Sequence, residues 1–141
     1  MNDGARFGQK PVRPSKADER RAYDDATARD GGRCVRCDWF GTMHRDHRKN
    51  RSQGGLTVVS NLQLLCGPHG DDPGCHHWAT VNPREAMGLG FAVPSYARPE
   101  LWPGWRLHEG WVVYFDQPDE NGDWWRSVSQ FTADQLMNRN D

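Results

Sequence analysis

Four cysteines, arranged as two pairs, form the clearest chemical pattern in this sequence of 141 residues. Cys34 and Cys37 make a Cys-x-x-Cys turn, and eight residues rich in Gly and Pro separate Cys66 from Cys75. Two thiolates on a tight turn can bind one side of a tetrahedral Zn²⁺, and a second pair can complete the site. His69 lies inside the second loop and is an alternative ligand to either of its cysteines. We therefore predict a structural zinc site, with redox or disulfide chemistry and unliganded thiols as the alternatives.

A second group of chemically active residues lies between the cysteine pairs and directly after them. Asp46 offers a hard oxygen ligand and His76 an imidazole, which suit a divalent cation with open positions for a phosphate oxygen and water. His47 follows the carboxylate, and a neutral imidazole could take a proton from a water that attacks phosphorus. A surface histidine beside Asp and Arg more often forms a solvated ion pair. The order and spacing of these residues favour phosphodiester hydrolysis instead.

The combined pattern resembles a known family, the HNH endonucleases with a ββα-metal (His-Me finger) fold, in the zinc-stabilised form frequent in bacteriophage genomes. The resemblance covers about residues 23–87. It rests on these residues in order: Cys34-x-x-Cys37, Asp46-His47, Gly54-Gly55, Asn61-Leu62, Leu65-Cys66 and Cys75-His76.

This resemblance implies a role for each matching position. His47 falls where the family has its general base, and Asp46 and His76 fall on ligands of the catalytic ion, Mg²⁺ or another divalent metal. Asn61 matches the asparagine that hydrogen-bonds across the loop and holds the base in orientation. DNA is the implied substrate. The family context also implies a role in phage DNA processing or packaging, with phage packaging proteins as further candidate partners.

The sequence departs from the family pattern at three places. Asn50 stands where the family often has Pro, and the second cysteine pair is more widely spaced than usual. Thr80 stands where many members have another metal ligand, so that His77 or water would complete the coordination sphere. His44 is left outside the predicted site, because at its position it could equally contact DNA or solvent.

Charge is unevenly distributed along the chain, although the formal net charge is only -1. Residues 1–55 contain 13 Lys and Arg against 8 Asp and Glu, whereas residues 56–141 contain 5 against 11. The N-terminal part is therefore the candidate surface for a polyanion. Besides the basic arm, we predict that four side chains contact DNA phosphates, namely those of Arg45, Arg48, Lys49 and Arg51.

The composition predicts a small α+β protein with a thin core, because only 35% of its residues are hydrophobic. We expect a flexible basic arm and the start of a helix over residues 1–22, an HNH nuclease domain over 23–90 and an aromatic-rich β-hairpin extension over 91–141. Neither a membrane span nor a secretory signal is recognisable, so a cytoplasmic location is expected, in the host cell if the chain is phage-encoded. The sequence leaves the oligomeric state open.

Local patterns predict the elements around the chemical residues. Residues 16–29 lack Gly and Pro and follow a capping pattern, which predicts a helix. Residues 34–43 and 56–59 are predicted as the two arms of a hairpin. A second helix is expected over residues 75–87, ended or kinked by Pro83.

The C-terminal part is rich in aromatic and β-forming residues. Residues 111–115 and 124–128 are predicted to form a hairpin, with a turn signal at Asn121-Gly122. Five of the seven tryptophans lie between Trp102 and Trp125, and we expect them to pack rather than to stack on bases. Two other functions stay open at this point: a zinc-stabilised DNA-binding module without catalysis, and an adaptor that binds a partner through the tryptophan-rich part.

Overall fold

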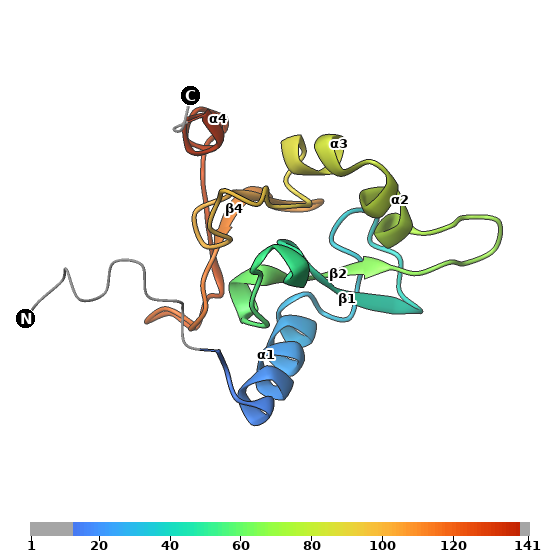
Figure 1. The fold of residues 1–141 in the computed structure, drawn as a ribbon, viewed down its shortest axis with the longest axis horizontal. Helices are drawn as coiled ribbons and strands as arrows, with labels where there is room; N and C mark the ends of the chain where they lie inside the picture. Colours follow the sequence, from blue (N-terminus) through green and yellow to red (C-terminus); the bar gives the residue numbers. More distant parts are fainter. Residues whose placement is uncertain (1–12, 139–141) are drawn as a thin grey trace, which may run out of the picture.

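A β-hairpin between two helices forms the centre of the protein (Figure 1). The computed structural model describes residues 13–138. Strands β1 and β2 are antiparallel, with Met43 opposite Cys66 and His47 opposite Leu62. The elements in chain order are α1 (Lys16–Arg29), β1 (Met43–His47), the 3-10 helices η2 (Arg51–Gln53) and η3 (Val59–Asn61), β2 (Leu62–Cys66), α2 (Cys75–Val81), α3 (Pro83–Gly88), β3 (Gly104–Arg106), β4 (Gly110–Tyr114), β5 (Trp125–Ser127) and α4 (Gln130–Asn138).

Helix α1 confirms the helix predicted over residues 16–29. The Ser15 hydroxyl accepts a hydrogen bond from the Asp18 backbone N–H at 3.0 Å, and the Asp18 carboxylate accepts one from the Ser15 backbone N–H. These two bonds satisfy donors that a helix start otherwise leaves unpaired. The helix ends before Gly31 and Gly32, whose φ values of 64° and 70° favour glycine and turn the chain toward the first cysteine pair.

The predicted positions of the hairpin arms, 34–43 and 56–59, are wrong. Residues 34–40 instead form a tight knuckle, in which the Cys34 N–H donates to the Trp39 carbonyl at 3.0 Å and Asp38 takes a positive φ of 71°. Residues 56–58 form a loop that leads into η3, whose first residue is Val59. The true partner strands are β1 and β2, and β2 is buried along its whole length. Long-range pairing with this buried strand holds the polar segment of β1 in extended form.

The helix predicted over residues 75–87 is divided into α2 and α3. Asn82 separates them with φ −127° and ψ 60°, which is not a helical conformation. Pro83 causes this break, because proline disfavours the α conformation in the residue before it and itself suits the first position of a new helix. Helix α2 packs on β2, so that β1, β2 and α2 form a ββα unit.

The C-terminal part is larger than the predicted hairpin. Strands β4 and β5 pair where the hairpin is expected, with Val112 opposite Ser127, but β3 adds a third strand to the other edge of β4. Helix α4, which the sequence analysis did not predict, follows the sheet. Trp102 is buried against Val93 and Ala97, which agrees with a packing role for this tryptophan.

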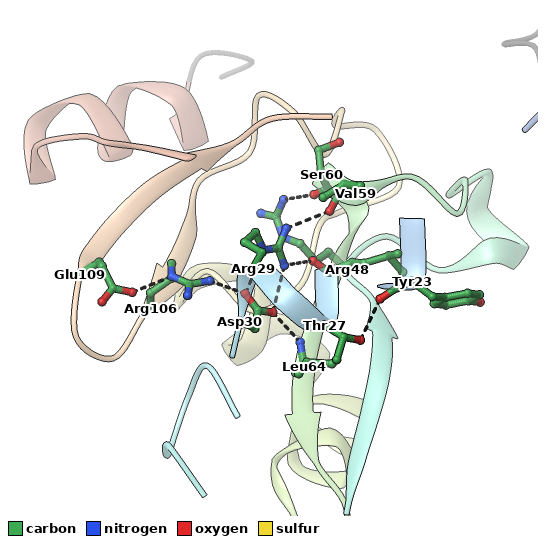
Figure 2. A network of polar contacts seen from close by, with 11 residues as sticks. Tyr23, Thr27, Arg29, Asp30, Arg48, Val59, Ser60, Leu64, Arg106 and Glu109 are labelled. Atoms are coloured by element: carbon green, nitrogen blue, oxygen red, sulfur yellow. Dashed lines mark hydrogen bonds and ion pairs between the residues drawn. The ribbon is translucent and has the colours of Figure 1, made fainter. Parts of the chain in front are cut away.

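A buried polar network joins α1, β2 and the C-terminal sheet (Figure 2). The Asp30 carboxylate is fully buried, pairs with Arg29 at 2.9 Å and with Arg106, and accepts the Leu64 backbone N–H at 3.0 Å. Arg29 also donates to the carbonyls of Val59 and Leu62. One carboxylate therefore neutralises two arginines from distant parts of the chain, and it fixes the end of α1 against β2.

Replacing Asp30 with Asn is expected to lower the free energy of unfolding by about 3–5 kcal/mol, because it leaves the buried Arg29 guanidinium without its counter-charge and leaves Arg106 with only the partly exposed Glu109. Denaturant titration measures this loss, and Glu120→Gln, which removes an exposed carboxylate, is the matched control. Equal stability of the two variants would show that the network contributes nothing.

The apolar core consists of three small clusters rather than one large one. The first contains three of the four cysteines together with Val35, Leu65 and Phe91, so the fold depends strongly on the cysteine region. Among the described residues, no helix combines the length and the apolar character that crossing a membrane requires.

Candidate active site and metal centre

The four cysteines meet at one point of the fold. Cys34 and Cys37 come from the knuckle before β1, Cys66 ends β2 and Cys75 begins α2. Their sulfur atoms all lie within 4.8 Å of one another, and those of Cys37 and Cys66 are 3.7 Å apart. Four sulfurs around a tetrahedral Zn²⁺ with Zn–S bonds of about 2.3 Å lie about 3.8 Å apart. The cluster is therefore consistent with a structural zinc site.

The eight residues between Cys66 and Cys75 form a folded loop that brings the two cysteines together. Gly74 takes a positive φ of 95°, and a Cβ there would lie 2.6 Å from the Cys66 carbonyl oxygen, so only glycine fits. The Cys75 N–H then donates to the Cys66 sulfur at 3.2 Å. His69 does not join the cluster, because its ring stacks on Trp39 with centroids 3.8 Å apart. The four cysteines are thus the set that converges.

Mutual contacts and burial shift the pKa values of the cysteine thiols in opposite directions. A hydrogen bond from Cys75 lowers the pKa of Cys34 to about 5, whereas burial raises the pKa of Cys66 to about 11. The four sulfurs therefore cannot all be thiolates at neutral pH unless a positive ion joins them. Arg36 supplies part of the opposite charge, because its guanidinium lies 3.3 Å from the Cys75 sulfur and stacks over Trp78.

The two residues predicted to hold a catalytic ion lie side by side. Asp46 Oδ1 lies 3.0 Å from His76 Nδ1, which brings together one carboxylate from β1 and one imidazole from the first turn of α2. Gln63 of β2 donates from Nε2 to Asp46 Oδ2 at 3.0 Å and to the Phe91 carbonyl at 2.7 Å. The sequence analysis missed Gln63, whose signal is a polar residue within the apolar strand Leu-Gln-Leu-Leu-Cys.

His44 belongs to the same group of side chains, although the prediction left it out. Its ring stacks on that of His76 with centroids 4.2 Å apart and an interplanar angle of 13°. The alternation of a strand explains this position, because His44 and Asp46 are two residues apart on β1. The hydrogen bond to Asp46 raises the pKa of His76, while burial and then the neighbouring His76 lower the pKa of His44.

His47 leaves β1 in a different direction from Asp46. Its Nε2 atom lies 2.8 Å from the Thr57 hydroxyl oxygen, and its ring stands edge-on to that of Tyr23. Burial and then the nearby Arg51 lower the pKa of His47. The imidazole is therefore neutral near pH 7, which is the form that can accept a proton.

Asn61 is fully buried and fastens the loop that follows His47. Its Oδ1 accepts the Lys49 N–H at 2.7 Å, and its Nδ2 donates to the carbonyls of Lys49 and Leu56 at 3.0 and 2.9 Å. These hydrogen bonds pair backbone groups at both ends of the loop from Lys49 to Leu56. Asn61 therefore acts on the loop backbone, and no hydrogen bond joins it directly to the His47 ring within the described residues.

The predicted contact of Arg48 with DNA conflicts with the structure. Arg48 is 2% exposed, and burial lowers its pKa to about 10. Its guanidinium donates to three backbone carbonyls, those of Ser60, Pro99 and Trp102 (Figure 2 shows the first). A side chain held in this way cannot reach a phosphate. Arg48 instead ties the segment after β1 to the C-terminal part.

The other three predicted phosphate contacts differ in exposure. Lys49 is half-buried and donates from Nζ to the Ala97 carbonyl at 3.0 Å. Arg45 and Arg51 have exposed side chains, and their nearest carboxylate oxygens lie 3.8 and 4.0 Å away. These long distances leave both guanidinium groups available to another anion. Residues 1–12 of the predicted basic arm lie outside the described residues.

Asp46 and His47 line one cavity of about 150 Å³ between β1 and the α2–α3 region. Thr80, at the place of a further family ligand, also lines it, and its hydroxyl donates to the His76 carbonyl at 2.9 Å. His77 is exposed and is not part of the lining. The cavity thus combines a carboxylate of a type that can bind a metal with a neutral imidazole, and such a pair could activate water beside a bound phosphate.

Comparison with known proteins finds one family model that matches part of the chain. Residues 34–68 match the family model of the HNH endonuclease, a range that begins at the first cysteine and includes Asp46, His47 and Asn61. No curated protein and no solved structure was found to match the chain.

Proposed function

We propose that this chain, which contains an HNH endonuclease region and a four-cysteine cluster, is a metal-dependent DNA endonuclease that hydrolyses phosphodiester bonds. The observation that carries the proposal is the cavity that Asp46 and His47 both line, with Asp46 also paired to His76 at 3.0 Å. The match of residues 34–68 to the HNH endonuclease model supports nuclease activity and a DNA substrate.

Each side chain of the candidate site has a different role in the proposed reaction. His47 accepts a proton from the attacking water, because burial keeps its ring neutral. Asp46 and His76 would hold one divalent ion, and Gln63 orients the carboxylate that binds it. When bound, that ion supplies positive charge to the phosphate and to the leaving oxygen. Asn61 keeps the loop after His47 in place.

Two kinds of metal site with different tasks follow from this arrangement. The four cysteines form a closed site of sulfur ligands, which supports folding and offers no position for substrate. The Asp46–His76 pair has one oxygen and one nitrogen ligand and leaves room for water and phosphate. We propose Zn²⁺ for the first site and Mg²⁺ or another divalent ion for the second.

The proposal is tested by incubating the purified, zinc-loaded protein with supercoiled plasmid and added Mg²⁺ or Mn²⁺. Conversion to nicked or linear DNA is the expected result, and the ratio of these products reports cutting of one strand or both. Retardation of DNA in a gel without any cleavage would favour the alternative, a zinc-stabilised binding module without catalysis.

The DNA-binding surface gives a separate prediction. Arg45→Ala combined with Arg51→Ala is expected to weaken DNA binding and to reduce the slope of log K against log salt by about 2, because each lost phosphate contact removes about one released counterion. Fluorescence anisotropy at several salt concentrations measures the slope. Arg126→Ala, an exposed arginine on β5, is the control, and an equal change in this control would contradict the proposed surface.

The third hypothesis, an adaptor that acts through the tryptophan-rich part, receives less support. The C-terminal segment provides the Pro99 and Trp102 carbonyls that bind Arg48, and the Val93 N–H donates to the Arg48 carbonyl at 2.8 Å. These contacts favour a role in holding the loop next to His47. A place in the processing or packaging of a phage genome stays a prediction.

A further inference from the structure

A basic cleft lies beside the candidate active site, between the start of α1 and the loop that follows β1. Its volume is about 530 Å³, and its charged lining residues are Arg13, Lys16, Glu19 and Arg51. We propose that this basic cleft binds a backbone phosphate that flanks the scissile phosphate on the same DNA strand. The inference rests on the proposed nuclease function. The first three of these residues precede the region that matches the HNH endonuclease model, so the match does not assign the site.

The basic cleft contains more positive charge than its own carboxylate can neutralise. Glu19 is the one acidic residue among its lining residues, and its Oε2 atom lies 4.0 Å from a guanidinium nitrogen of Arg51. Within residues 13–138, neither Arg13 nor Lys16 forms an ion pair. Three cations therefore share a single carboxylate. An excess of positive charge in a concave surface attracts an anion, and a phosphate diester is the anion that DNA presents.

The backbone of the loop that carries Arg51 is held in one shape. The Gly55 N–H donates to the Asn50 carbonyl at 2.9 Å. A Cβ at Gly55 would lie 1.9 Å from the Lys49 carbonyl oxygen, so only glycine allows this close packing. The Asn61 side chain in turn bonds both the N–H and the carbonyl of Lys49. Only exposed side chains therefore have to become ordered when a phosphate binds, which keeps the entropic cost of binding low.

The basic cleft shares a wall with the candidate active site. Thr57 lines the cleft, and its Oγ1 atom lies 2.8 Å from Nε2 of His47. His47 in turn lines the neighbouring cavity together with Asp46. Phosphates of one DNA strand follow each other at intervals of about 3.4 Å along the helix axis. A strand whose scissile phosphate lies beside His47 therefore brings a flanking phosphate to the basic cleft.

The role of the cleft is to bind and position the strand. Contacts with phosphates fix the register of a protein on DNA but do not read its base sequence. We therefore expect Arg13 and Lys16 to contribute to DNA affinity and to the placement of the scissile bond. Neither residue takes part in the chemical step, and neither contributes to a preference for particular bases.

Arg13→Ala combined with Lys16→Ala tests the site without any cleavage. Fluorescence anisotropy of a labelled duplex is measured with the zinc-loaded full-length protein at several salt concentrations, in the absence of added Mg²⁺ or Mn²⁺. The slope of log K against log salt is expected to fall by about 1, the value for one lost phosphate contact. Both side chains are exposed, so the double variant should keep its zinc content and its NMR spectrum.

A charge-matched control is Arg98→Ala combined with Arg126→Ala, because both arginines are exposed and neither lines the basic cleft. This control should keep the wild-type slope. An equal fall in the control would overturn the site, because it would show a general effect of lost positive charge.

A second measurement determines whether the bound phosphate flanks the cleaved bond. The cleavage position is first mapped in a synthetic duplex with Mg²⁺ or Mn²⁺, and single phosphates around it are then replaced by neutral methylphosphonates. At one flanking position, we expect the replacement to lower the wild-type cleavage rate at subsaturating enzyme about tenfold, the usual effect of losing a hydrogen bond to a charged group. The same replacement should have little further effect in the Arg13→Ala and Lys16→Ala double variant. Equal effects in both proteins at every position would overturn the proposal.

These outcomes distinguish the basic cleft from the proposed function. Cleavage by the wild-type protein, with an unchanged salt slope in the double variant, overturns the cleft as a phosphate site and leaves the nuclease intact. An acidic segment of a partner protein then becomes the candidate occupant. A wild-type protein that cleaves no DNA, but whose salt slope falls only in the double variant, overturns the nuclease function and supports the cleft as a DNA phosphate site.

Discussion

Replacing Cys66 with Ser is expected to leave most of the chain unfolded. Cys66 is fully buried, ends β2 and belongs to the apolar cluster that contains Val35 and Phe91. Structural Zn²⁺ in zinc-finger peptides binds with an apparent free energy of about 10–16 kcal/mol, which equals or exceeds the net stability of a typical domain, about 5–15 kcal/mol. Loss of one thiolate therefore removes a large part of the folding free energy from a protein with a small core.

Circular dichroism, NMR signal dispersion and elemental analysis for zinc measure this effect together. The wild-type protein should contain one zinc per chain, and Cys66→Ser should lose both the metal and the dispersed spectrum. Asp71→Ser, an exposed change in the loop between the second cysteine pair, is the matched control and should keep both. A Cys66→Ser variant as stable as the wild-type protein would show that the cluster does not support the fold through a metal.

Replacing His47 with Ala is expected to lower the cleavage rate by about 10²–10⁴-fold, the usual contribution of a general base. The change removes the neutral imidazole that lines the cavity beside Asp46. The Kd for DNA should change little, because the exposed arginines are untouched. Stability should fall only modestly, since the ring is half-buried and makes one side-chain hydrogen bond, to Thr57.

Single-turnover cleavage with saturating enzyme separates the rate from DNA binding. His77→Ala is the matched control, because His77 is an exposed histidine on α2 outside the cavity. The prediction fails if His47→Ala retains the wild-type rate, or if His77→Ala loses as much activity as His47→Ala does.

The chemical residues could be predicted from the sequence because their types limit what they can do. Cys34-x-x-Cys37, Asp46-His47 and Cys75-His76 are short local patterns of good metal ligands, and the structure brings together the four cysteines and, separately, Asp46 with His76. The β1 strand could not be located in this way. Its five residues, Met-His-Arg-Asp-His, contain one apolar side chain, so their extended form depends on pairing with the buried β2.

Arg48 shows a second limit of sequence reasoning. A run of basic residues usually indicates a solvated surface, and Arg45 and Arg51 follow that rule. Arg48 is buried because carbonyl groups 51 and 54 residues further along the chain surround its guanidinium. No residue close to Arg48 in the sequence indicates these hydrogen-bond partners. Thr57 was overlooked and His44 was left out of the predicted site for the same reason, since their contacts with His47 and His76 arise only from the tertiary fold.

The most direct test of the account is plasmid cleavage by the zinc-loaded wild-type protein after brief treatment with EDTA. The treatment is chosen so that elemental analysis still finds one zinc per chain, which leaves the cysteine site filled and removes ions bound at the Asp46–His76 pair. The account predicts no cleavage in this state and full recovery when Mg²⁺ or Mn²⁺ is added. Cleavage that persists without the added ion, or DNA that stays intact with every divalent ion tested, would contradict a metal-dependent endonuclease.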